Sequence, residues 1–124
     1  METWQAFIRR KDLEFKKAKP IPMKDIGRAG THYFEREAWT FMPQSNLKEK
    51  VFVIERLKKV HLDGKAVHSK TSLKGSVEYR IGYYMIGKNG NKKGRWTWGQ
   101  FCPMIPKEDF NKLMKKAARE GTVG

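Results

Sequence analysis

The sequence predicts an α+β domain, in which an antiparallel sheet of about five strands carries a C-terminal helix packed on one face. Two patterns indicate this class: runs of strand length occupy the middle of the chain, and a helical apolar stripe ends it. At 124 residues with 39% hydrophobic residues, the chain can bury a core without disulfides. We therefore expect one domain over residues 1–124.

The N-terminal element, residues 1–19, is ambiguous. Apolar residues at roughly helical spacing in it are Trp4, Phe7, Ile8, Phe15 and Ala18. Residues 4–9 also have the length of a short strand. Asp12 would cap a helix over residues 13–18. Two prolines and two glycines then predict a surface loop over residues 19–30.

Two strands are expected next. Residues 33–42 and 51–62 are rich in aromatic and branched side chains, and a proline-containing turn separates them. Asp63-Gly64 follows, a strong signal for a two-residue hairpin turn because both turn positions need positive φ. We therefore expect residues 58–62 to pair with residues 65–69.

A second hairpin is predicted further along. Residues 77–87 alternate and indicate a central strand, residues 89–94 have the glycine and asparagine content of a turn, and residues 95–102 would run back as the partner strand. Gly82 and Gly87 interrupt the strand, which indicates close packing or a bulge at these positions.

The C-terminal helix, residues 107–120, has the clearest pattern. Pro106 suits a first helical position, and two acidic residues near it favour the positive end of the helix dipole. The apolar stripe comprises Phe110, Leu113, Met114 and Ala117. Gly121 is placed to end the helix.

The charge balance is strongly basic. The chain has 27 Lys and Arg against 13 Asp and Glu, a formal net charge of +14, and a pI near 10.0. Residues 25–50 are balanced, whereas residues 51–100 hold eleven basic and three acidic side chains. A basic excess of this size is typical of nucleic-acid binders, although a basic surface can also serve solubility alone.

The first candidate site is the hairpin of residues 83–101. Its candidate binding residues are Lys88, Lys92, Lys93, Arg95, Trp96 and Trp98. A long polar turn places its cations in solvent, where they can contact phosphates. The two tryptophans share one strand face. Their rings either stack on bases or belong to the core beneath the C-terminal helix.

A second basic cluster surrounds Asp63-Gly64. Its candidate binding residues are Arg56, Lys58, Lys59 and Lys65. Arg56 and Lys58 share one strand face and Lys59 takes the other. Such cations either contact phosphates or protect an edge strand from aggregation.

Catalytic chemistry has little support in the sequence. The three histidines include no pair at helical metal-ligand spacing. Asp63, Glu78 and Arg80 imitate the order of a metal-dependent nuclease site, but arginine is a poor substitute for the lysine of such sites. Cys102 is expected to be a small buried apolar residue. We expect no catalytic residue, no metal site and no cofactor.

The function expected from the sequence is therefore nucleic-acid binding, DNA or RNA, through phosphate contacts from the two hairpins and base stacking by exposed tryptophans. The alternative is an accessory or inhibitory protein that binds an acidic protein or a nucleoprotein complex. An exposed patch at Trp39, Phe41 and Met42 would mark that alternative. A metal-dependent nuclease is the third candidate.

A reducing compartment is expected because the chain has one cysteine. No apolar run reaches the roughly 20 residues that span a bilayer, and the first residues lack the apolar core of a signal peptide. These features predict a cytoplasmic protein with no membrane partner.

Overall fold

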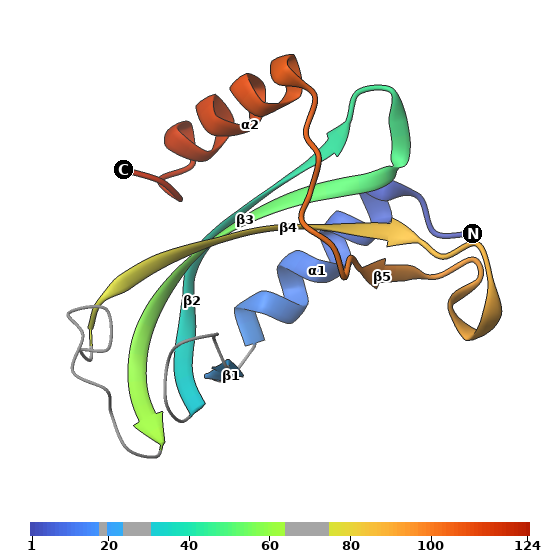
Figure 1. Ribbon diagram of the computed structural model, residues 1–124. Coiled ribbons are helices and arrows are strands. Elements are labelled where there is room, and N and C mark those ends of the chain that lie inside the picture. The colour runs from blue at the N-terminus through green and yellow to red at the C-terminus, as the bar shows by residue number, and fades with distance from the viewer. Residues whose placement is uncertain (18–19, 24–30, 64–74) are drawn as a thin grey trace.

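The computed structural model describes residues 1–17, 20–23, 31–63 and 75–124. Within these ranges five antiparallel strands form one curled sheet in the order β1-β2-β3-β4-β5, with two helices against it (Figure 1). The elements in chain order are α1 (Trp4–Lys17), β1 (Ile21–Met23), β2 (Thr31–Gln44), β3 (Leu47–Asp63), β4 (Val77–Ile86), a short 3-10 helix (Gly90–Lys92), β5 (Trp96–Trp98) and α2 (Lys107–Arg119). The predicted α+β class is confirmed.

The sheet curls along its two longest strands. β2 and β3 have 14 and 17 residues, and a two-residue turn at Ser45 and Asn46 joins them. Their register shifts between Tyr33 and Phe34 and again between Arg36 and Ala38. Such irregularities bend a strand and increase its twist. Figure 1 shows α1 on the inner side of the curl and α2 on its outer side.

The N-terminal element is a single helix. Thr3 caps it, because its Oγ1 accepts a hydrogen bond from the Ala6 N–H at 3.2 Å. The predicted cap at Asp12 is wrong: Asp12 lies inside α1, and its Oδ1 accepts a hydrogen bond from Trp39 Nε1 at 2.8 Å. Phe7 and Phe15 are the buried residues of α1 and turn its apolar stripe toward the sheet.

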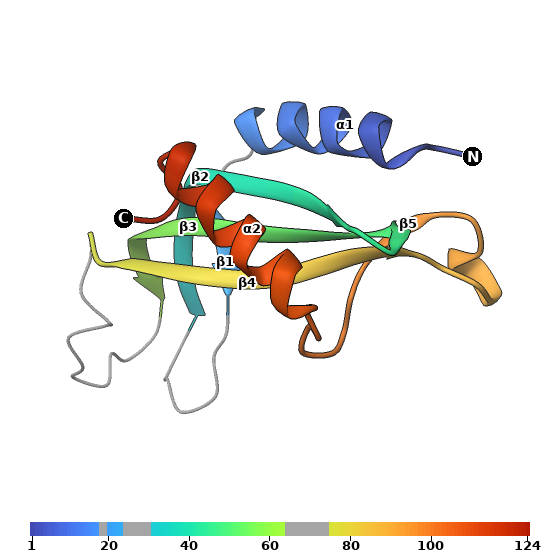
Figure 2. The same ribbon diagram turned by 90° about the horizontal axis from the view of Figure 1, so that it is seen from above.

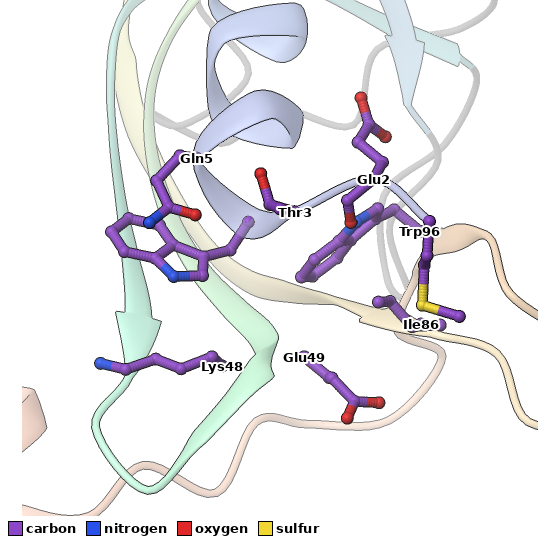
Figure 3. Close-up of a pocket in the computed structure, with 9 residues that line it drawn as sticks. Glu2, Thr3, Gln5, Lys48, Glu49, Ile86 and Trp96 are labelled. Carbon is purple, nitrogen blue, oxygen red and sulfur yellow. The ribbon is translucent and has the colours of Figure 1, made fainter.

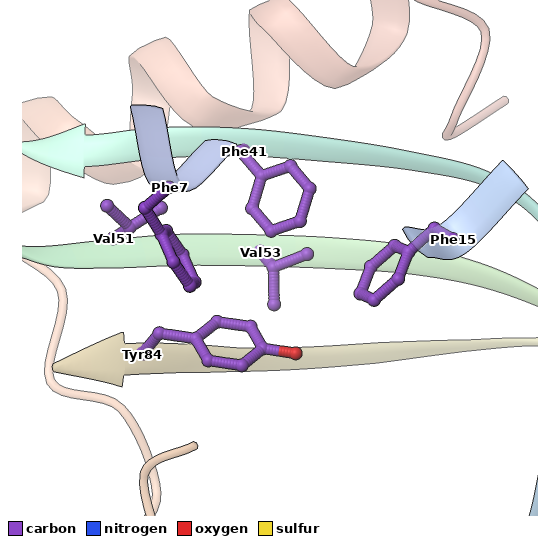
Figure 4. Close-up of a cluster of buried hydrophobic side chains, with 6 residues drawn as sticks. All are labelled: Phe7, Phe15, Phe41, Val51, Val53 and Tyr84. Carbon is purple, nitrogen blue, oxygen red and sulfur yellow. The ribbon is translucent and has the colours of Figure 1, made fainter. Parts of the chain in front are cut away.

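The core on the α1 face of the sheet is aromatic (Figure 4). Its buried members are Phe7, Phe15, Phe41, Val51, Val53 and Tyr84. Phe7 contacts Tyr84 at 5.0 Å between ring centroids, and Phe15 contacts Phe41 at 5.5 Å. A second core lies on the α2 face, because successive side chains of a strand point to opposite faces. It comprises Phe52, Ile54, Tyr83, Leu113 and Ala117.

The C-terminal helix packs on one face of the sheet, as predicted. Asp109 holds its start, because Oδ2 accepts hydrogen bonds from Ser45 N at 3.0 Å and Ser45 Oγ at 3.2 Å. Gly121 follows its end with φ +78°, as a glycine after a helix usually does. Phe110 departs from the predicted stripe and is 42% exposed. Figure 2 shows α2 lying across the strands, well separated from α1.

Two predictions about strands need correction. β1 lies inside the expected surface loop, where Met23 pairs with His32 of β2. The expected pairing of Lys58 with Ser69 is wrong. Lys58 is paired with Glu35 of β2 on one side and with Val77 of β4 on the other, so no side of β3 is open to a further strand at this residue. Residues 65–69 lie outside the described residues.

Candidate nucleic-acid interface

The predicted second hairpin exists, and its turn has a defined conformation. Tyr84 pairs with Trp98 in the β4–β5 register. Residues 88–95, called the hairpin tip below, are held by four backbone hydrogen bonds. They are Gly87 N–H to Arg95 O at 2.9 Å, Gly94 N–H to Gly87 O at 2.9 Å, Arg95 N–H to Lys92 O at 3.0 Å and Lys93 N–H to Gly90 O at 3.2 Å. These bonds preorganise the tip.

Gly87 makes this closure possible. A Cβ at Gly87 would lie 2.3 Å from the Lys92 carbonyl oxygen, so any other residue would push the turn away from the strand. The interpretation of Gly87 as a close-packing glycine is confirmed.

Four cations project from the hairpin tip into solvent. They are Lys88, Lys92, Lys93 and Arg95. None of them makes an ion pair within the described part of the chain. Their charges are therefore available to a partner. Figure 1 shows the tip extending beyond the sheet at the end of the molecule where the N-terminus lies.

Trp96 is a packing residue. Its indole stacks on Phe7 with ring centroids 4.5 Å apart and planes at 17°, and its Nε1–H donates to the Glu2 carbonyl oxygen at 2.9 Å. The expectation that Trp96 packs against the core is confirmed, but the helix that covers it is α1 and not the C-terminal helix. One ring face of Trp96 is taken by Phe7 and is not available to a base.

Trp98 is the more accessible of the two tryptophans and is 37% exposed. It meets Tyr84 edge to face at 5.0 Å, and the Arg80 guanidinium lies 4.9 Å from the centroid of its ring. A Cβ at Gly82 would lie 2.2 Å from Cη2 of Trp98, so Gly82 also marks close packing as predicted. These contacts hold Trp98 in place on the α1 face of the sheet.

A hollow of about 350 Å³ lies between the hairpin tip and the segment after β5. This aromatic hollow is lined by Tyr83, Met85, Ile86, Gly87, Lys88, Lys92, Thr97, Trp98, Gly99, Gln100 and Phe101. The Gly99 N–H donates to the Tyr83 carbonyl oxygen at 2.8 Å and closes the far wall. Phe101 is 79% exposed. The sequence pattern does not single out Phe101, which falls within the predicted strand of residues 95–102.

A second hollow, of about 430 Å³, lies between the start of α1 and the β2–β3 hairpin (Figure 3). Its charged lining residues are Glu2, Lys48 and Glu49. The Glu2 carboxylate accepts hydrogen bonds from Arg10 Nε at 2.9 Å and Nη2 at 2.8 Å, so Glu49 is the carboxylate of this lining that makes no ion pair with another described residue. The two hollows therefore differ in that carboxylates line this one and none lines the aromatic hollow.

The other predicted basic cluster is divided by the fold. Arg56 is engaged internally, since its Nε lies 3.1 Å from Glu37 Oε1 and its Nη1 donates to the Tyr79 hydroxyl at 2.7 Å. Lys58 is exposed, as predicted. Lys59 is 1% exposed, so a phosphate cannot reach it without displacing the residues around it. Lys65 lies outside the described residues.

A buried charge cluster lies on the α1 face beside Trp98, and sequence reasoning missed it. Glu55 is 0% exposed. Its carboxylate accepts from Arg36 Nε at 2.6 Å, from Arg80 Nε at 2.6 Å and from Arg80 Nη2 at 3.1 Å. The available signal was a glutamate at an alternating position that continues the face of Val51 and Val53.

The geometry does not support a nuclease site that uses Arg80, because the Arg80 guanidinium is already paired with Glu55. Within the described ranges, no group of three or more His, Cys, Asp or Glu side chains could hold a metal ion. Cys102 is exposed, which corrects the expectation of a buried thiol: it lies in the open segment between β5 and α2.

The patch that would mark the interaction alternative is not exposed. Phe41 is 3% exposed, Trp39 is half-buried and bonded to Asp12, and Met42 packs against the core beneath α2. These three residues therefore do not supply the feature that would have distinguished the interaction alternative, because α1 and α2 contact β2 from its two faces.

No protein-family model, curated protein or solved structure matches the chain. Neither helix in the described ranges is long and apolar enough to cross a membrane.

Proposed function

We propose that this protein binds nucleic acid through the β4–β5 hairpin. The observation that supports the proposal is the hairpin tip itself. Its four exposed cations make no ion pair among the residues that the structure describes, and backbone hydrogen bonds hold the loop that carries them. Two exposed aromatic residues, Trp98 and Phe101, lie next to it. Cations that track phosphates beside aromatic rings that take bases are the usual elements of single-strand binding sites.

The physical basis is counterion release. Each phosphate that a lysine or arginine neutralises frees condensed salt ions, so affinity falls with rising salt at a log-log slope of about −0.9 per contact on duplex DNA and −0.7 on single strands. The formal charge of +14 adds long-range attraction of any polyanion. Because the tip cations make no ion pair with another described residue, a phosphate contact need not break one there.

The tip is favoured over the second basic cluster by position as well as by exposure. Lys58 pairs with Val77 at the start of β4, whereas Lys88 follows the end of β4. The ten residues of β4 separate these sites by at most about 33 Å along the strand. We therefore place the main phosphate contacts on the tip and treat Lys58 as a peripheral contact.

The test is a charge-matched comparison. One variant replaces the four tip cations by glutamine; the control replaces four exposed cations of α2, namely Lys107, Lys112, Lys115 and Arg119. Both variants lose four charges, so only position differs. Fluorescence anisotropy with DNA and RNA of about 20 nucleotides, single- and double-stranded, measures affinity over a salt series.

If all four tip cations contact phosphates, these contacts alone make the association constant fall about 50- to 150-fold between about 50 and 200 mM salt. The tip variant should therefore bind more weakly at low salt, and its affinity should depend less steeply on salt. The α2 variant should keep most of the affinity and most of the salt dependence. Equal losses in both variants would mean that general charge, and not the tip, drives binding. An affinity of the unaltered protein that ignores salt would overturn the proposal.

One observation favours the interaction alternative as a second candidate. Val77, Tyr79 and Ile81 share the α2 face of β4 and are 37%, 45% and 39% exposed. An apolar row of this kind is typical of a protein contact, here with an acidic protein or a nucleoprotein complex. Tight binding of polyglutamate together with no binding of any oligonucleotide would favour this candidate. Under the first proposal, Ile81→Ser leaves oligonucleotide affinity unchanged.

A further inference from the structure

We infer that the aromatic hollow binds one unpaired base of a single strand, with the base on the Phe101 ring and its phosphate beside Lys88 and Lys92. The inference rests on the proposed function and names its substrate class: single-stranded nucleic acid in preference to duplex. It assigns a stacking role to Phe101, which the sequence pattern did not indicate.

The charges around the hollow select an anion. Lys88 and Lys92 line it, and no carboxylate does. The N-terminal hollow differs, because Glu2 and Glu49 line it together with Lys48. A volume of about 350 Å³ is near the lower end of the range of roughly 300–1,000 Å³ for ligand sites. This size suits a single nucleotide better than a large cofactor.

The ring that would take the base is exposed and free of other ring contacts. Phe101 is 79% exposed and stacks on no aromatic ring within the described part of the chain. A phenyl ring left in water beside two lysines gains from a flat partner, because stacking removes apolar surface from water. Gln100 also lines the hollow, and its amide can both donate to and accept from a base edge.

The walls of the hollow are preformed. Gly99 is bonded to the Tyr83 carbonyl, and a Cβ at Gly99 would lie 2.2 Å from the Tyr83 ring. Trp98 is fixed between Tyr84 and Arg80. Binding therefore needs little ordering of the protein, which favours affinity. A paired and stacked base of a duplex cannot reach Phe101 without leaving its stack.

The experiment compares Phe101→Ala with Met104→Ala. Met104 is a matched control, because it is 81% exposed on the same segment but does not line the hollow. Neither truncation removes a buried side chain, so both variants should fold. Oligothymidine of about 12 nucleotides and a duplex of equal length are titrated at one salt concentration, and the salt slope is measured for each.

Phe101→Ala should weaken single-strand binding about 5- to 150-fold, the effect of losing one stacked base, and should leave duplex affinity and the salt slope unchanged. Phe101→Trp should restore the affinity. Met104→Ala should change neither. Lys88→Gln should reduce single-strand affinity more than Lys93→Gln, since Lys93 lies on the tip outside the hollow.

The two proposals fail in different ways. If the unaltered protein binds neither strand nor duplex, the proposed function is wrong. If it binds both with a normal salt slope, but Phe101→Ala behaves as Met104→Ala or weakens strand and duplex equally, the hairpin still binds nucleic acid and the base site is wrong.

Discussion

The indole of Trp96 lies nearly parallel to the ring of Phe7, with centroids 4.5 Å apart. This contact joins β5 to α1, and the Trp96 N–H bond to the Glu2 carbonyl reinforces it. Because Phe7 is 0% exposed, the stack is part of the core and anchors the base of the hairpin that carries the tip.

Trp96→Ala should therefore destabilise the fold by about 3–5 kcal/mol, the usual effect of removing a large packed aromatic side chain. Urea unfolding followed by circular dichroism measures the change. Trp98→Ala is the control, since that ring is 37% exposed and should lose less. Equal losses for the two variants would contradict the assignment of Trp96 as the packing residue.

Glu55 holds two guanidinium groups on the α1 face of the sheet. Glu55→Gln should cost about 3–5 kcal/mol in unfolding free energy, because it leaves Arg36 and Arg80 without a counter-charge in a largely buried place. Glu35→Gln is the control: Glu35 is exposed on β2 and should change stability by less than about 0.5 kcal/mol. A neutral result for Glu55→Gln would mean that solvent screens the cluster.

Gly82 leaves room for the Trp98 ring. Gly82→Ala should destabilise the protein by about 1–3 kcal/mol and shift the Trp98 indole N–H resonance, because the new Cβ meets the ring at 2.2 Å. In the Trp98→Ala background the same change should cost less, since the clash is gone. Additive effects in this double-mutant cycle would show that Gly82 is needed for another reason.

Alkaline pH should weaken the fold through Tyr84. Burial raises the pKa of Tyr84 from 10.0 to about 12, so the unfolded chain loses its phenolic proton at lower pH than the folded one. The stabilisation is complete below pH 10.0 and is lost as pH rises toward 12. Tyrosinate absorbance and urea unfolding measure this. In Tyr84→Phe the free energy of unfolding should fall less steeply between pH 10 and 12. An unchanged pH profile in that variant would assign the loss of stability to other groups.

Short-range patterns predicted much of the fold. The alternation of residues 77–87 and the apolar spacing after Pro106 correspond to β4 and α2, since a strand or helix that buries one face must repeat its apolar residues at the period of its backbone. Gly82 and Gly87 were interpreted correctly for the same local reason. The N-terminal element is ambiguous in sequence, because Trp4, Phe7 and Ile8 have helical spacing but residues 4–9 also have the length of a short strand.

The candidate site was predicted only in part. The exposure of Lys88, Lys92, Lys93 and Arg95 follows from a polar turn that cannot be buried. Lys59 is buried and Arg56 is paired with Glu37 because of the residues that pack around them. The spacing of residues in the sequence does not encode these contacts. Phe101 gave no signal, because an exposed and a buried phenylalanine look alike in sequence.

The sequence by itself determined that this protein is a basic α+β domain with cations at the turn after residue 87, because composition, period and turn chemistry are local properties of the chain. Only the tertiary structure decided that α1 covers Trp96, that Arg36 and Arg80 enclose Glu55, and that Phe101 stands open beside Lys88 and Lys92. Those arrangements join residues far apart in the chain, so they arise when the sheet curls and its faces are covered, not when its strands form.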